Sequence, residues 1–159
     1  MPEILLKPPD LSAHSTRLLL QWCLERGSDQ FTWGCLGGAS GLAPFCVAVE
    51  QALESLALPA APRPHLTRTQ TEPFIRETGL WRFNNESLVI LTGFLPDGLF
   101  TDRQGNSDGW IEDVTLYRGS ELLLGVITHE GEAALRATDA EIRDLRERRL
   151  VPRNSVNRS

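Results

Sequence analysis

One acidic segment of the chain places a histidine where it could take part in chemistry. In the sequence "THEGEAA", His129 is followed by Glu130, Gly131 and Glu132, so an imidazole and two carboxylates occur close together. Such groups bind metal ions or act as acid–base pairs. The zinc-protease motif His-Glu-x-x-His requires a second histidine one helical turn away, and this segment lacks it. We therefore interpret these residues as a tight polar turn between two strands, without a reactive centre.

The long loop of residues 93–113 contains a second candidate metal site. Asn106 and Asp108 are two residues apart and precede a glycine, as in part of a calcium-binding loop. Gln104 stands where the first acid of such a loop belongs, and Thr115 replaces its bidentate glutamate. We favour a plain turn and expect no resident cofactor. The candidate metal ligands, should the loop bind an ion, are Gln104, Asn106 and Asp108.

The same loop also carries apolar side chains. Phe94, Leu99 and Phe100 lie among proline, glycine and acidic residues, and Trp110 ends the loop. A connection this long is usually functional or disordered, and apolar residues disfavour disorder. These side chains therefore either pack into the core or form a contact surface. In the second case a protein partner binds to Phe94, Leu99, Phe100, Trp110 and Asp102. The acidic residues of the loop would attract a partner with a basic surface.

The composition limits the classes of protein to which the chain can belong. Its 159 residues, 41% of them hydrophobic, suit a single domain with a buried core. The formal net charge of -5 disfavours nucleic acid and anionic membranes as partners. No apolar run approaches the roughly 20 residues of a membrane span. We therefore expect no membrane partner and a cytoplasmic location.

The cysteine and lysine residues exclude several kinds of site. Cys23, Cys35 and Cys46 are odd in number and widely spaced, which fits neither a disulfide framework nor a Cys-x-x-Cys metal motif. We expect three reduced, mostly buried thiols. Lys7 is the only lysine, so the chain has no phosphate-binding Gly-Lys-Ser/Thr loop.

The hydrophobic periodicity predicts one α+β domain over residues 1–159. Two N-terminal helices pack on an antiparallel meander of about five strands, and a C-terminal helix follows. A strand near residues 122–127 is apolar on both faces, so one face is expected under the helices and the other under another segment or a partner. The expected parts are a helical part at 12–58, a proline-rich linker at 59–73, the sheet at 79–137, with strands at 79–83, 87–92, 110–117, 121–128 and 132–137, and the last helix at 139–150.

The leading functional hypothesis is a soluble, non-catalytic protein-binding domain of the inhibitor, chaperone or adaptor type. It would act through the apolar and acidic loop, and a homo-oligomer is left open. The alternative is a small-molecule or metal-dependent enzyme with a site between the sheet and the helices, formed by His129 with Glu112, Glu130 or Glu132. A second alternative is nucleic-acid binding through the arginine-rich last helix, although a solvated helix face explains these arginines better.

Overall fold

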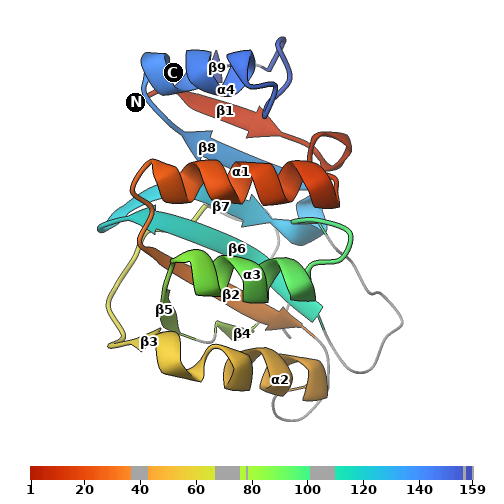
Figure 1. The fold of residues 1–159 in the computed structure, drawn as a ribbon, viewed down its shortest axis with the longest axis vertical. Helices are drawn as coiled ribbons and strands as arrows, with labels where there is room; N and C mark the ends of the chain where they lie inside the picture. Colours follow the sequence, from red (N-terminus) through yellow and green to blue (C-terminus); the bar gives the residue numbers. More distant parts are fainter. Residues whose placement is uncertain (37–42, 67–75, 78, 101–109, 156, 159) are drawn as a thin grey trace.

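The structure is a computed structural model that describes residues 1–36, 43–66, 76–77, 79–100, 110–155 and 157–158. These residues form an α+β fold in which one antiparallel sheet is flanked by helices (Figure 1). The order of the strands is β3-β5-β2-β6-β7-β8-β1-β9, and β4 also pairs with β2. The helices are α1 (Ala13–Glu25), α2 (Pro44–Ala52), α3 (Asn85–Phe94) and α4 (Asp139–Glu147), with short 3-10 turns η1 (Pro8–Asp10), η2 (Glu54–Leu56) and η3 (Thr128–Glu130). The strands are β1 (Glu3–Leu6), β2 (Gln30–Leu36), β3 (Ala57–Leu58), β4 (Arg76–Glu77), β5 (Leu80–Arg82), β6 (Trp110–Arg118), β7 (Glu121–Ile127), β8 (Glu132–Arg136) and β9 (Asn157–Arg158).

The predicted meander is present in β6, β7 and β8, which pair in the order of the sequence. The sheet is larger than the predicted five strands because the N-terminal strand β1 pairs with β8, and β2 pairs with β6. The part predicted to hold the two N-terminal helices and the loop between them, residues 12–58, therefore contains strand β2 between its helices. The residues of this strand from Phe31 to Cys35 are all buried, which is the pattern of a strand covered on both faces.

The predicted strand at residues 87–92 is wrong, because this segment forms helix α3. Asn84 is the N-cap: its side chain accepts a hydrogen bond from the backbone N–H of Ser87 at 3.0 Å. Ser87 Oγ in turn accepts one from the backbone N–H of Asn84 at 2.8 Å. Asparagine favours turns and helix N-caps alike, and here Leu88 and Leu91 are buried at helical spacing. The capping pair and this spacing decide for a helix.

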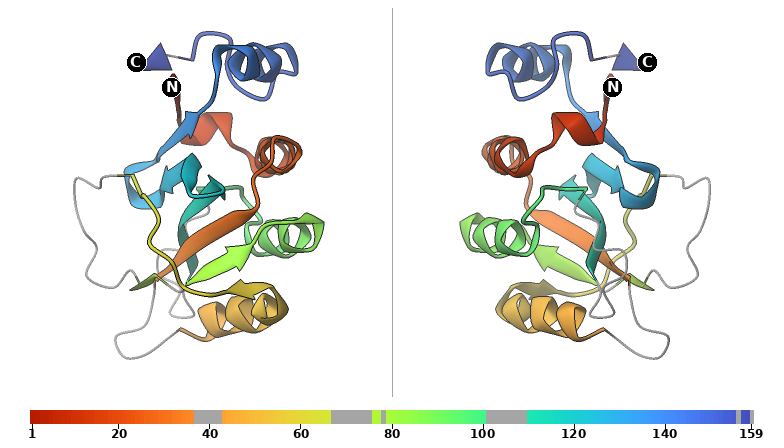
Figure 2. Two further views of the ribbon diagram at one scale, coloured as in Figure 1. Left: turned by 90° about the vertical axis from the view of Figure 1, so that its left-hand side faces the viewer. Right: turned by 90° about the vertical axis from the view of Figure 1, so that its right-hand side faces the viewer.

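Helices α1, α2 and α3 lie on one face of the sheet, whereas residues 59–66 cross the opposite face (Figure 2). We call residues 59–66 the strap; it has neither helix nor strand, as predicted for the described part of the 59–73 linker. The ring of His65 packs edge-on against Tyr117, with 6.2 Å between centroids. Leu66 lies so close to Gly125 that a Cβ there would be 2.7 Å from Leu66 Cγ. This chain itself thus covers the second face of β7.

The C-terminal helix begins as predicted. Thr138 is its N-cap and forms a capping box with Glu141. Asp144, on α4, accepts hydrogen bonds from Trp22 Nε1 at 2.8 Å and from the Arg26 guanidinium at 2.7 Å, so α4 is fixed to α1. Arg148 also pairs with Asp144 at 2.9 Å, so part of the positive charge of this helix is neutralised within the chain.

Two of the three cysteines form a disulfide, contrary to the prediction of reduced thiols. The bond joins Cys35 at the end of β2 to Cys46 on α2. Cys23 is a free, fully buried thiol. The sequence spacing gave no sign of the bond because it depends on α2 folding back beside β2.

None of the helices in the described ranges is long and apolar enough to span a bilayer.

Candidate metal centre

A β-bulge in strand β6 breaks the regular alternation of its side chains. In the pairing with β2, Thr115 lies opposite Thr32 and Glu112 lies opposite Gly34. Asp113 and the next residue therefore share a single partner on β2, which defines a bulge. Asp113 has φ of 51°, in the left-handed region that aspartate tolerates better than most residues. The bulge allows two consecutive acids, Glu112 and Asp113, to lie close together on one side of the sheet.

The face of the sheet that carries these acids follows from the register. Cys35 lies opposite Ile111 and is bonded to α2, so both residues belong to the face under the helices. Glu112 follows Ile111 and must point to the other face, where its partner Gly34 has no side chain. The enzyme alternative expected its site between the sheet and the helices, whereas the register places Glu112 on the opposite face.

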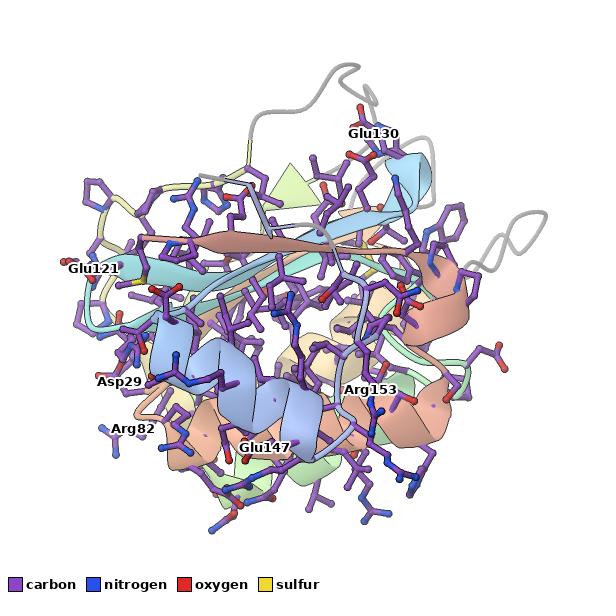
Figure 3. All side chains as sticks on the ribbon, turned by 90° about the horizontal axis from the view of Figure 1, so that it is seen from above. Asp29, Arg82, Glu121, Glu130, Glu147 and Arg153 are labelled. Carbon is purple, nitrogen blue, oxygen red and sulfur yellow. A yellow bond between two sulfur atoms is a disulfide. The ribbon has the colours of Figure 1, made fainter. Side chains whose placement is uncertain are left out.

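Turn η3 places His129 over the same face. The turn follows β7 and ends at Gly131, whose φ of 62° is in the left-handed region. A Cβ on Gly131 would also be 3.3 Å from Pro8 Cγ. The predicted tight turn in this segment is thus present. Viewed from above, Glu130 in η3 lies on the opposite side of the sheet from Glu147 of α4 (Figure 3).

Two reciprocal hydrogen bonds hold η3 against β6. The backbone N–H of Thr128 donates to Asp113 Oδ1 at 2.8 Å, and the backbone N–H of Asp113 donates to Thr128 Oγ1 at 2.9 Å. Both residues are buried. Since His129 is the next residue after Thr128, these bonds fix the histidine beside the bulge.

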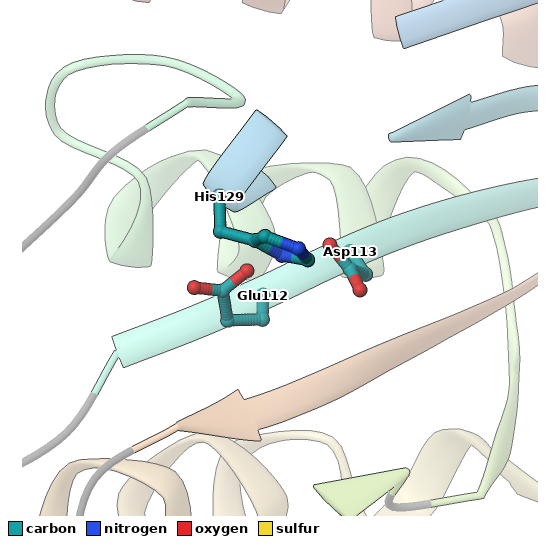
Figure 4. Close-up of side chains that lie close together, drawn as sticks. All are labelled: Glu112, Asp113 and His129. Carbon is teal, nitrogen blue, oxygen red and sulfur yellow. The ribbon is translucent and has the colours of Figure 1, made fainter. Parts of the chain in front are cut away.

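Glu112, Asp113 and His129 come together as a cluster (Figure 4). One ligand atom from each of the three lies within 4.8 Å of the other two. Glu112 is only 2% exposed and Asp113 5%, and the side chain of His129 is 15% exposed. The expectation that the polar residues around His129 serve only a turn is therefore corrected. They form a turn that also contributes to a buried cluster of three ionisable groups.

Several polar atoms of the cluster have unused hydrogen-bonding capacity. Glu112 Oε1 accepts a hydrogen bond from Trp110 Nε1 at 2.8 Å. Glu112 Oε2 and both ring nitrogens of His129 are buried and have no hydrogen-bond partner in the part of the chain that the structure describes. The distance from His129 Nε2 to Glu130 Oε1 is 3.9 Å, too long for a hydrogen bond. Native proteins seldom leave buried polar atoms unsatisfied, because each costs about 1–3 kcal/mol.

The surroundings of Glu112 raise the pKa of its carboxyl group. Burial raises the pKa of its carboxyl group from 4.5 to about 7, against the opposing effect of the hydrogen bond from Trp110. The nearby carboxylate of Asp113 raises the pKa further, and His129 lowers it. Two carboxyl groups are thus held close together in a place where water stabilises neither well. A cation between them would remove this penalty.

The donor set suits a divalent metal ion. Zinc and other first-row ions bind imidazole nitrogen and carboxylate oxygen, and manganese accepts carboxylates readily. Three protein ligands leave at least one coordination position for water or a substrate, as in catalytic zinc sites. Glu130 would then lie beside the imidazole and could orient it, in the way carboxylates commonly orient metal-bound histidines.

The described residues that were predicted to bind a partner are not members of the cluster, although Trp110 contacts it. Leu99 is 1% exposed, so its side chain is not available to a partner. Phe94 packs edge-on against Phe45, and Phe100 is partly buried against the core. Trp110 is partly buried and donates to Glu112. Asp102 and the predicted calcium ligands Gln104, Asn106 and Asp108 lie outside the described residues.

Asp113 is the member of the cluster that the sequence analysis missed. The sequence "WIEDVTLY" does contain a signal, namely two adjacent acids in an otherwise apolar strand. In a regular strand one of the two would face the helices, which would require a buried charge there. A bulge resolves this conflict.

Comparisons of the chain with protein-family models, curated proteins and solved structures gave no significant match, so its function must be inferred from the site itself.

Proposed function

We propose that this protein is a metal-dependent enzyme acting on a small molecule, with a first-row divalent ion such as zinc held by Glu112, Asp113 and His129. The observation that carries the proposal is the buried cluster itself, in which Glu112 Oε2 and the imidazole nitrogens lack hydrogen-bond partners among the described residues. The ion would satisfy these atoms and compensate the two carboxylates. Its open position would hold a water molecule, which bound zinc converts into a nucleophile near neutral pH.

A metal-free acid–base pair explains the same residues less well. In such a pair the histidine and its carboxylate are within hydrogen-bond reach, so that one can orient the other or pass it a proton. The shortest ion-pair distance for His129 is 3.9 Å, to Glu130, and its ring nitrogens have no hydrogen bond within the described ranges. The cluster atoms lie within 4.8 Å of one another. Ligands about 2.2 Å from a central ion are at most about 4.4 Å apart, so a small rotation of these side chains would close the cluster around an ion.

The test is a calorimetric titration of the metal-free protein with zinc, manganese, magnesium and calcium ions. We expect one ion per chain, with zinc or manganese bound more tightly than magnesium or calcium. His129→Gln and Glu112→Gln should each weaken binding by more than about 100-fold, since even loss of an outer-sphere partner commonly costs about 10- to 100-fold. The matched controls are His14→Gln and Glu121→Gln, two exposed residues outside the cluster. Equal binding by all four variants would refute the proposal.

Binding of a protein partner is a second candidate function. It is supported by Val89 and Leu18, which are 65% and 41% exposed on helices α3 and α1. These two helices pack against each other, so the exposed apolar side chains lie on neighbouring helices. Val89→Asp should abolish capture of such a partner, basic or otherwise, without unfolding the chain. Unchanged capture of the partner by this variant would contradict the second candidate function.

The cytoplasmic location remains a prediction.

A further inference from the structure

The disulfide lies across the sheet from the proposed metal centre, one residue away in the register of β2 and β6. Its half-cystine Cys35 is in register with Ile111, and the preceding residue on β2, Gly34, is in register with Glu112. The bond joins this stretch of β2 to α2, which also packs against β6. The segment of β6 that enters the bulge is therefore held between a paired strand and a helix that are covalently linked.

A chain of contacts leads from the disulfide to the carboxylate of Glu112. Cys46 Sγ lies 3.8 Å from the carbonyl oxygen of Trp110. The indole N–H of the same tryptophan donates to Glu112 Oε1 at 2.8 Å. Since a disulfide sulfur carries no hydrogen, the sulfur only packs against the carbonyl, whereas a Cys46 thiol could donate to it. Loss of the disulfide would thus change both the anchoring of α2 and the contact made with Trp110.

We propose that Trp110 is a positioning residue for the metal ligand Glu112, and that the Cys35–Cys46 disulfide holds Trp110 in place, so that the oxidised chain is the form competent to bind metal. This inference rests on the proposed function. Glu112 needs positioning because, among the described residues, only its Oε1 accepts a hydrogen bond of good geometry, the one from Trp110. The side chain of Thr128 interacts with this carboxyl group more weakly. Outer-sphere hydrogen bonds of this kind commonly set metal affinity over about 10- to 100-fold.

The maturation step that follows is a two-electron oxidation. The Cys35 and Cys46 thiols lose two protons and two electrons to a small-molecule or protein disulfide, which leaves as two thiols, and one S–S bond forms in the chain. Cys35 is 3% exposed and Cys46 is fully buried in the folded chain. Thiols in solution reach such a bond poorly, so it should persist once formed. The oxidation is therefore a lasting maturation step and not a rapidly reversible switch.

The test compares zinc affinity in four forms of the full chain. Trp110→Phe, which retains an aromatic ring but no N–H, should bind zinc about 10- to 100-fold more weakly than the oxidised wild type. The double variant Cys35→Ser, Cys46→Ser should show a loss in the same range. Trp22→Phe is the matched control, because it removes another indole–carboxylate hydrogen bond of 2.8 Å, to Asp144, far from the site. Its zinc affinity should equal that of the wild type.

A spectroscopic readout separates positioning from a merely structural role. In protein with 15N-labelled tryptophan, zinc should shift the indole N–H resonance of Trp110, assigned by its absence in Trp110→Phe, and leave that of Trp22 unchanged. If the double cysteine variant does not fold, the Trp110→Phe and Trp22→Phe pair still decides. Wild-type affinity in Trp110→Phe, together with an unmoved indole resonance, would overturn the positioning proposal and leave the metal centre standing. No zinc binding by the oxidised wild type would overturn both.

Discussion

Asp113 and Thr128 hold each other through two hydrogen bonds, each donated by the backbone N–H of one residue to the side chain of the other. The pair joins the bulge of β6 to turn η3, two parts of the chain between which strand β7 lies in the sequence. It therefore fixes the acid that the bulge redirects and the histidine that the turn carries. The geometry of the proposed metal centre depends on this pair.

Replacement of Thr128 by valine should destabilise the fold as well as the site. The substitution keeps the shape of the side chain but leaves the buried backbone N–H of Asp113 without its acceptor at 2.9 Å. We expect the free energy of unfolding to fall by about 1–3 kcal/mol in urea denaturation. In Thr92→Val, where the hydroxyl bonds back to carbonyls of its own helix, the change should stay within about 0.5 kcal/mol. Similar losses in both variants would show that the pair has no special role.

Replacement of Asp113 by asparagine should separate the fold from metal binding. Asparagine tolerates a φ of 51° and keeps an oxygen that can accept from Thr128, but it removes the negative charge. We expect the free energy of unfolding to change by less than about 1.5 kcal/mol, the typical net value of one hydrogen bond. Zinc affinity should nevertheless fall sharply in calorimetry. An Asp113→Asn variant that binds zinc as tightly as the wild type would exclude Asp113 as a ligand.

Replacement of Glu112 by glutamine should stabilise the metal-free protein at neutral and higher pH. Burial raises the pKa of Glu112 from 4.5 to about 7, so the folded state holds the proton more tightly than the unfolded state. The stability of the wild type therefore falls as the pH rises from about 4.5 to about 7, and the full loss remains above that. Glutamine, which stays neutral, avoids a loss of at most about 3 kcal/mol. The measurement is urea denaturation of both proteins at pH 5 and pH 8.

A stability difference of this sign would mark Glu112 as a residue retained for function. Replacing a residue that serves only packing lowers the stability of the protein. Replacing a functional residue often raises it, because such residues are retained although they destabilise the folded state. The control is Glu121→Gln, an exposed change for which we expect no difference between the two pH values. A Glu112→Gln variant that is less stable than the wild type at pH 8 would argue that the carboxylate has a structural role.

The junction between α1 and α4 should determine part of the acid sensitivity of the protein. Hydrogen bonds from Trp22 and Arg26 lower the pKa of Asp144 from 3.8 to about 2. A lowered pKa stabilises the fold above the unfolded-state value and loses this contribution as the pH falls through the folded-state value, here from about 4 to about 2. In Asp144→Asn this part of the acid transition should disappear in a circular dichroism titration. An unchanged acid transition would contradict the prediction.

The sequence predicted those elements whose signals are local. Thr138 and Glu141 form the predicted capping box, and the β6–β7–β8 meander follows from short connections between apolar runs. Helix α3 was missed because asparagine at position 84 is equally typical of a turn, and its capping bonds with Ser87 and the burial of Leu88 and Leu91 distinguish the two only in the structure. Strand β1 was missed because its partner, β8, lies more than a hundred residues away in the sequence.

The candidate metal centre could be predicted only in part. His129 and Glu112 belong to the residues considered for a site, but their proximity depends on a register between β2 and β6 that is shifted by one residue. Whether consecutive acids share a face is decided by that bulge and by the conformation of Asp113, neither of which changes the local composition. The disulfide likewise depends on tertiary packing, since it joins β2 to the following helix.

The most direct test of the metal centre is an X-ray structure of crystals grown with zinc, with anomalous data collected above and below the zinc absorption edge. We expect an anomalous difference peak within about 2.2 Å of a carboxylate oxygen of Glu112, one of Asp113 and a ring nitrogen of His129. Ordered side chains at all three positions with no peak between them, or a zinc peak at other residues only, would contradict the central claim.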